Sequence, residues 1–140
     1  MMSGIRAKNT RPELIIRKGL FAKGLRYRLH DKKLPGKPDL VFPKYRVVLF
    51  VNGCFWHGHA CDLFKMPSTN RDFWENKIGT NQANDAKNKE LLLTAGWRVV
   101  TIWECAIKGK RRLDINTLIS SVNDLIRNNP GDVTSELMHK

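Results

Sequence analysis

Cysteine and histidine, two residue types that bind metals, are concentrated in one segment of the chain. Cys54 and Cys61 flank His57 and His59, and a third cysteine, Cys105, lies far downstream. Structural zinc is held by thiolate and imidazole ligands in a closed tetrahedron. Three cysteines cannot all pair, so a disulfide framework explains them less well. We therefore predict a structural zinc site made of Cys54, His59, Cys61 and Cys105; the alternative is three free cysteines and incidental histidines.

A second group of residues could perform phosphodiester hydrolysis, which needs a metal at the phosphate and an activated water. Asp39 opens an apolar run, and a carboxylate on a strand suits a hard cation such as Mg²⁺. His57 is not needed by the zinc tetrahedron, so its imidazole can act as a general base. Glu13 can join them if its helix packs on the sheet. The simpler alternatives are turn chemistry for Asp39 and helix capping for Glu13.

The elements that must position these residues follow from turn residues and apolar periodicity. Thr10, Pro12 and Glu13 start a helix, which ends at Gly24. Gly79 is expected to separate two later helices. In chain order we predict a helix over 10–24, strands over 27–29, 39–42 and 46–51, helices over 70–78 and 81–95, a strand over 97–103 and a helix over 113–127. This order of helices and strands predicts an α/β fold, a three-layer sandwich around a central mixed sheet.

The chain has 140 residues and a formal charge of +12, with 25 Lys and Arg against 13 Asp and Glu. This length fits one domain, over 1–127, with a disordered tail over 128–140. The charge favours a polyanionic partner, since each neutralised phosphate releases counterions; a basic surface without a partner is the simpler alternative. No segment reaches the roughly 18 apolar residues of a membrane span, and 1–10 lacks the apolar core of a secretory signal, so we expect a cytoplasmic protein.

Four segments resemble the very-short-patch mismatch repair endonucleases. They are LPGKPDLVF at 34–42, NGCFWHGHAC at 52–61, DFWENKI at 72–78, and GWRVV with the later WEC at 96–105. The resemblance implies a nuclease fold related to type II restriction enzymes, with a structural zinc. It also implies Mg²⁺-dependent nicking of one strand of double-stranded DNA, next to T:G mismatches left by deamination of 5-methylcytosine. The implied setting is the bacterial cytoplasm and nucleoid, with mismatch-repair proteins as candidate partners.

The same resemblance implies a role for individual residues. Asp39 matches the metal-binding aspartate, and Val51 would offer its main-chain carbonyl to the magnesium ion. His57 matches the histidine that activates water. Asn52 stands where the family has a histidine, and an amide cannot carry a proton. The matches to outer-sphere residues around the metal are Glu13, Asn81 and Asp85, and those to the zinc ligands are Cys54, His59, Cys61 and Cys105.

DNA binding is the last property that the resemblance implies. Aromatic side chains would wedge into the duplex, at a cost of roughly a few kcal/mol that is lower at a mismatched step. An N-terminal arm over 1–10 would enter the other groove. The DNA-binding residues are Phe55, Trp56 and Trp74 for the wedge, and Met2, Arg6 and Lys8 for the arm. The alternative for the aromatic residues is that they cap the core beside the zinc loop.

Two other functions compete with this one. A non-catalytic zinc module that binds DNA would explain the charge and the zinc ligands, but it leaves Asp39, Glu13 and His57 unexplained. A related nuclease for other mismatches, or for branched or modified DNA, stays open because of the departure at Asn52. We expect a monomer, since the predicted helices leave no apolar stripe exposed.

Overall fold

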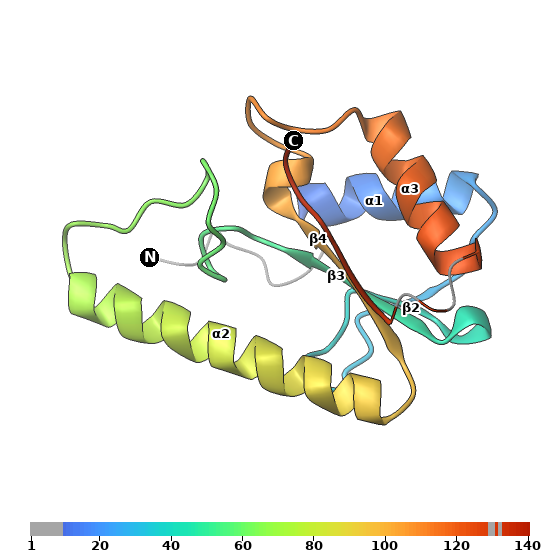
Figure 1. Ribbon diagram of the computed structural model, residues 1–140, viewed down its shortest axis with the longest axis horizontal. Helices are drawn as coiled ribbons and strands as arrows, with labels where there is room; N and C mark the ends of the chain where they lie inside the picture. Colours follow the sequence, from blue (N-terminus) through green and yellow to red (C-terminus); the bar gives the residue numbers. More distant parts are fainter. Residues whose placement is uncertain (1–9, 129–130, 132) are drawn as a thin grey trace.

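The structure is a computed structural model that describes residues 10–128, 131 and 133–140. In this described part, five strands form one mixed sheet in the order β1-β2-β3-β4-β5, flanked by three α-helices (Figure 1). The strands are β1 (Arg28–Leu29), β2 (Leu40–Phe42), β3 (Val47–Asn52), β4 (Arg98–Trp103) and β5 (Thr134–Leu137). The helices are α1 (Arg11–Ala22), α2 (Arg71–Thr94) and α3 (Ile115–Asn128), with short 3-10 turns η2 (Pro43–Tyr45) and η3 (Glu104–Ala106).

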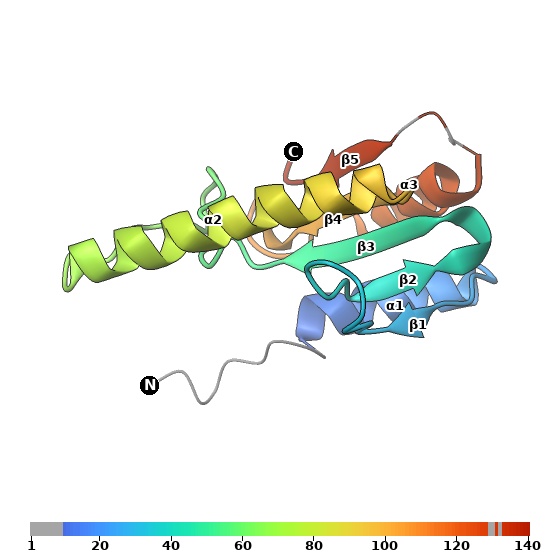
Figure 2. The same ribbon diagram turned by 90° about the horizontal axis from the view of Figure 1, so that it is seen from below.

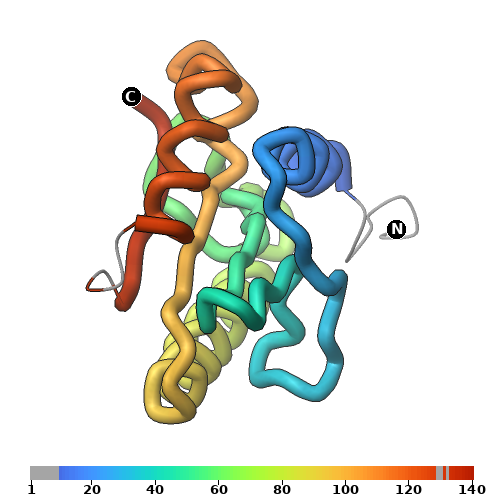
Figure 3. Tube along the Cα trace, turned by 90° about the vertical axis from the view of Figure 1, so that its right-hand side faces the viewer, coloured from blue at the N-terminus to red at the C-terminus, as the bar shows by residue number. Residues whose placement is uncertain are grey.

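Helices cover both faces of the sheet, because alternate residues of each strand point to opposite sides. Leu49 belongs to the cluster that α1 and α3 complete, whereas its neighbour Val48 packs with Leu92 of α2. Figure 2 shows α2 across one face, and Figure 3 shows α1 and α3 side by side on the other. The predicted α/β class and central mixed sheet are therefore confirmed.

The hairpin of β2 and β3 was also predicted correctly. The two strands are antiparallel, with Leu40 opposite Leu49, and η2 connects them. Arg46 closes the turn in the left-handed region, at φ 57. β4 then pairs with β3 in parallel, after the crossover through α2. Asp39, just before β2, is thereby brought next to the end of β3.

The prediction of two helices separated at Gly79 is wrong, because α2 runs without interruption from Arg71 to Thr94. A Cβ added at Gly79 would meet no atom within 4 Å, so this residue lies on an open face of the helix. Glycine in an exposed helix interior costs about 1 kcal/mol relative to alanine, which is too little to end a long helix. The first turns of α2 project beyond the sheet (Figures 1 and 2).

The predicted disordered tail over 128–140 is corrected as well. Residues 134–137 form β5, which lies parallel to β4 and completes the sheet. The indole Nε1 of Trp103 donates a hydrogen bond of 2.7 Å to Glu136, so a side-chain contact fixes the strand in addition to its backbone pairing. Among the residues that the structure describes, no helix combines the length and apolar character needed to cross a membrane.

Candidate functional site

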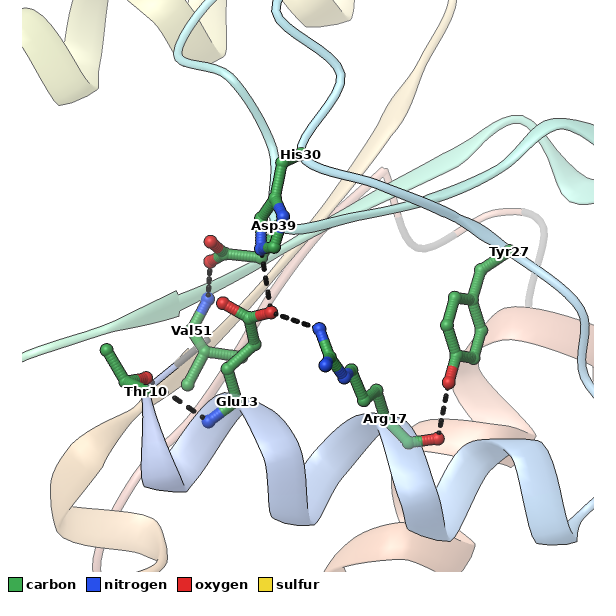
Figure 4. A network of polar contacts seen from close by, with 7 residues as sticks. All are labelled: Thr10, Glu13, Arg17, Tyr27, His30, Asp39 and Val51. Carbon is green, nitrogen blue, oxygen red and sulfur yellow. Dashed lines mark hydrogen bonds and ion pairs between the residues drawn. The ribbon is translucent and has the colours of Figure 1, made fainter. Parts of the chain in front are cut away.

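Asp39 is held at the junction of two strands. The backbone N–H of Val51, in β3, donates a hydrogen bond of 2.7 Å to its Oδ2. The main-chain oxygen of Asp39 accepts from the N–H of His30, at 3.0 Å. The carboxylate therefore has a fixed place beside the end of β3 (Figure 4).

Glu13 reaches the same place from the first turn of α1. Its N–H bonds the hydroxyl of Thr10, as the predicted cap requires, but its side chain points inward and is only 1% exposed. One carboxylate oxygen, Oε2, accepts from Nε2 of His30 at 2.7 Å and from Nη1 of Arg17 at 3.0 Å. Donor atoms of Glu13, His30 and Asp39 all lie within 4.8 Å of one another and could hold a metal ion.

Electrostatics at Asp39 also suit a cation. Burial, together with the neighbouring Glu13, raises the pKa of this carboxyl to about 7, although the hydrogen bond from Val51 acts in the opposite direction. Two carboxyl groups this close repel each other when both are ionised. A divalent cation would remove that repulsion, and carboxylate oxygen is the ligand that Mg²⁺ prefers. The donor set therefore fits a hard metal ion.

His57 lines the same cavity as Asp39. Its Nδ1 is hydrogen-bonded to Oδ2 of Asp85, on α2, which leaves Nε2 as the nitrogen without this partner. The cavity has a volume of about 310 Å³ and lies between the sheet and α2; Asp39, Asn52, His57, Asp85, Lys37 and Lys89 are among its lining residues. A candidate base and a candidate metal ligand thus open onto one space.

α2 also fastens the loop that carries His57. Asn81 donates a hydrogen bond of 2.8 Å to the main-chain oxygen of Trp56, and Gln82 donates one of 3.2 Å to that of His57. Asn81 and Asp85 are four residues apart, so both lie on the same face of the helix. These two residues, which the resemblance places around the metal, contact the loop residues Trp56 and His57.

The predicted zinc ligands come together. Cys54, His59, Cys61 and Cys105 offer donor atoms that all lie within 4.8 Å of one another. Nδ1 of His59 is 3.7 Å from the Sγ of Cys54 and 3.6 Å from that of Cys105. Burial and the neighbouring thiols raise the pKa of the Cys54 thiol, so its thiolate needs a cation beside it. This cluster of three sulfurs and one imidazole could hold a metal ion.

Aromatic side chains form a second cluster at the start of α2. Ring centroids of Phe55 are 5.2 Å from Trp56 and 5.3 Å from Trp74, and those of the two tryptophans are 5.6 Å apart. Phe73, which the sequence analysis missed, adds to it and is 59% exposed. Beside the cluster lies a second cavity, of about 770 Å³, whose lining residues include Phe55, Trp56, His57, Lys77 and Lys108. The predicted arm residues Met2, Arg6 and Lys8 lie outside the described residues.

His30 and Arg17 were the other members of the site that sequence reasoning missed. The only signal for His30 was its rarity, since the chain has four histidines. Arg17 could have been found from its spacing, because it follows Glu13 by four residues on the same helix face.

Comparison with known proteins places the chain in a family. Residues 1–63 match the family described as DNA mismatch endonuclease Vsr. A type II nicking enzyme of Xanthomonas oryzae pv. oryzae is 49% identical over 107 residues, which cover 76% of this chain and 79% of that protein. A type II nicking enzyme of Neisseria meningitidis is 43% identical over 128 residues, or 90% of this chain and 91% of its own. The DNA mismatch endonuclease Vsr of Escherichia coli is 41% identical over 125 residues, which cover 89% of this chain and 80% of that protein. With relatives this similar over most of its length, the chain belongs to the DNA mismatch endonuclease Vsr family.

Proposed function

We propose that this protein is a Mg²⁺-dependent DNA endonuclease that nicks one strand of a duplex next to a T:G mismatch, as in very-short-patch repair. Its fold would be that of the restriction-endonuclease class, with the parallel and antiparallel parts of one sheet meeting at the site. The observation that carries the proposal is the cavity onto which Asp39 and His57 both open. Family membership supports the same class of reaction.

Each residue of the site would have a separate task. Asp39 and the main-chain carbonyl of Val51 would hold Mg²⁺, with Glu13 as an outer-sphere partner. When bound, this cation would polarise the scissile phosphate. His57, held through Nδ1 by Asp85, would take a proton from the attacking water at Nε2, because a base oriented by a carboxylate is fixed in the right tautomer.

Asn52 changes this scheme at one point. It ends β3 and lines both cavities, next to His57. Its amide can donate a hydrogen bond to a phosphate oxygen but cannot give up a proton at neutral pH. The leaving oxygen would therefore be protonated by solvent water.

Zinc would serve the structure. Cys54, His59 and Cys61 belong to the loop after β3, and Cys105 belongs to η3, directly after β4. An ion held by all four would join the ends of two neighbouring parallel strands. Four protein ligands leave no open position for substrate, so this ion would have no part in the chemistry.

The aromatic cluster would read the mismatch. Phe55, Trp56 and Trp74 pack edge to face, which makes them a preformed wedge. Inserting such a wedge unstacks a base step, and a mismatched step is already weakened. The arm over 1–10, with Met2, Arg6 and Lys8, would hold the duplex from the other groove.

The test is a nicking assay on an end-labelled duplex with one T:G mismatch, beside its fully paired twin and a branched duplex, with and without Mg²⁺. We expect Mg²⁺-dependent cleavage of one strand at the mismatch by the wild type and none by Asp39→Asn. That variant keeps an acceptor for the N–H of Val51 and so preserves the local fold. Equal cleavage of paired or branched DNA would assign a different substrate, and DNA binding without cleavage would favour the non-catalytic module.

A further inference from the structure

We propose that His30 is a positioning residue of the catalytic centre, which fixes the carboxylate of Glu13 beside Asp39. This inference rests on the proposed function of the site. His30 is half-buried, with 17% of its side chain exposed, and it follows directly after β1.

His30 bonds both acidic residues, by two different groups. Its main-chain N–H donates to the main-chain oxygen of Asp39 at 3.0 Å, and its Nε2 lies 2.7 Å from Oε2 of Glu13. Glu13 and Asp39 come from different elements, α1 and the residue before β2. His30 therefore ties the first turn of α1 to Asp39, the candidate metal ligand directly before β2 (Figure 4).

The contacts of Glu13 select one orientation of its carboxylate. His30 and Arg17 both meet the same oxygen, Oε2, from different sides. Figure 4 shows the other oxygen on the side of Asp39 and Val51. Arg17 alone is a weak constraint, since an arginine four residues along a helix has several rotamers within reach of its partner. The second donor, which comes from the residue after β1, fixes the carboxylate in place.

The role of His30 would be that of a donor and not of a metal ligand. Oε2 of Glu13 already receives the guanidinium of Arg17, and a positive group there disfavours a cation at the same oxygen. Residues of the outer shell around a metal commonly change metal affinity by about 10–100-fold when they are removed. A side chain that retains an N–H donor at position 30 should preserve the metal affinity, even without an imidazole ring.

The experiment compares His30→Gln, which keeps a donor, with His30→Leu, which has none. Tyr27→Phe is the matched control, because it removes a hydrogen bond of 2.8 Å to the main-chain oxygen of Arg17 without touching Glu13. In zinc-loaded protein, Mn²⁺ binding is measured from the electron paramagnetic resonance of the free ion. Nicking of the T:G duplex is then measured against Mg²⁺ concentration, and thermal unfolding reports stability.

We expect His30→Leu to weaken Mn²⁺ binding by about 10-fold or more and to raise the Mg²⁺ requirement for nicking by a similar factor. His30→Gln and Tyr27→Phe should stay within about threefold of the wild type. Wild-type Mn²⁺ affinity in His30→Leu, with only a lower melting temperature, would show a merely structural role. Equal loss in the Gln and Leu variants would assign direct ligation by the imidazole and overturn the donor role.

Failure of the proposed function gives a different result. In that case wild-type protein would bind Mn²⁺ but leave the T:G duplex intact. The Mn²⁺ affinities of the two His30 variants would still decide the positioning role, because they need no substrate.

Discussion

The carboxyl group of Asp39 destabilises the protein when no cation is bound to it. Burial raises its pKa to about 7, so between the ordinary value of 3.8 and this one the folded state binds a proton that the unfolded state releases. The free energy of unfolding therefore falls as the pH rises through this range and is level above it. The carboxylate of Asp39 is thus a source of instability above this range, which a divalent cation bound there would relieve.

A neutral side chain at this position should remove the pH dependence. In zinc-loaded protein without added Mg²⁺, Asp39→Asn should gain stability over the wild type as the pH rises from 5.5 to 8. The expected gain is roughly 2 kcal/mol. The lower pH lies about 1.5 units below the raised pKa, and each unit corresponds to about 1.4 kcal/mol. Urea unfolding of both proteins at the two pH values measures it. A stability difference that does not change with pH would contradict this assignment.

At this scale the sequence predicted residue types better than residue partners. Asp39, His57 and the Cys/His group were found because few other residue types bind metals or move protons at neutral pH. The bond between His57 and Asp85 joins positions 28 residues apart, and the bond between Glu13 and His30 joins positions 17 apart. Such pairs depend on how α1 and α2 dock on the sheet, which no local pattern contains.

Docking of α1 on α3 requires a small residue at one point of the helix. A Cβ added at Gly19 would lie 2.5 Å from Cδ1 and 2.6 Å from Cγ1 of Ile119. Because Ile119 is itself buried, it cannot move aside freely. Since α1 also carries Glu13, this close approach of two helices helps to set the depth at which the acidic side chain enters the site.

Two glycine substitutions separate packing from helix propensity. Gly19→Ala should lower the free energy of unfolding by roughly 1–2 kcal/mol, because overpacking exceeds the gain from alanine. Gly79→Ala should raise it by up to about 1 kcal/mol, since its Cβ would meet no atom within 4 Å. Denaturant unfolding of the two variants checks both signs. Stabilisation by Gly19→Ala would mean that α1 and α3 are not packed this closely.

The errors at the scale of elements have a common cause. Gly79 was taken as the end of a helix and residues 128–140 as a tail because both segments lack strong local signals. α2 continues through the glycine because Ile78 and Leu92 are buried at distant points of one helix. β5 forms although alternate residues of it are exposed, because β4 offers a free edge and Trp103 a hydrogen bond. Tertiary contacts decided both cases.

Of the many basic residues in the molecule, we expect those near one end of the sheet to contact DNA. Lys77 and Lys108 line the larger cavity together with His57, at the end of β3. Lys44 lies in η2, which connects to the opposite end of β3, and its ammonium is 5.5 Å from the centre of the Tyr45 ring. Each of the three side chains contributes one unit to the net charge of +12, so total charge does not distinguish them. Lys108 also lies 3.8 Å from a carboxylate oxygen of Glu104, a solvent-accessible pair that phosphate can replace.

The salt dependence of DNA binding distinguishes local contacts between lysines and phosphates from the effect of the total charge. Each phosphate contact contributes about 0.9 to the slope of log affinity against log salt concentration. Lys77→Ala and Lys108→Ala should each reduce this slope by about 1, whereas Lys44→Ala should leave it unchanged. Fluorescence anisotropy with a labelled T:G duplex, in Ca²⁺ to support binding without cleavage, measures it at several salt concentrations. An equal reduction of the slope in all three variants would mean that DNA binding depends on the overall charge. It would contradict a DNA-binding face at the end of β3.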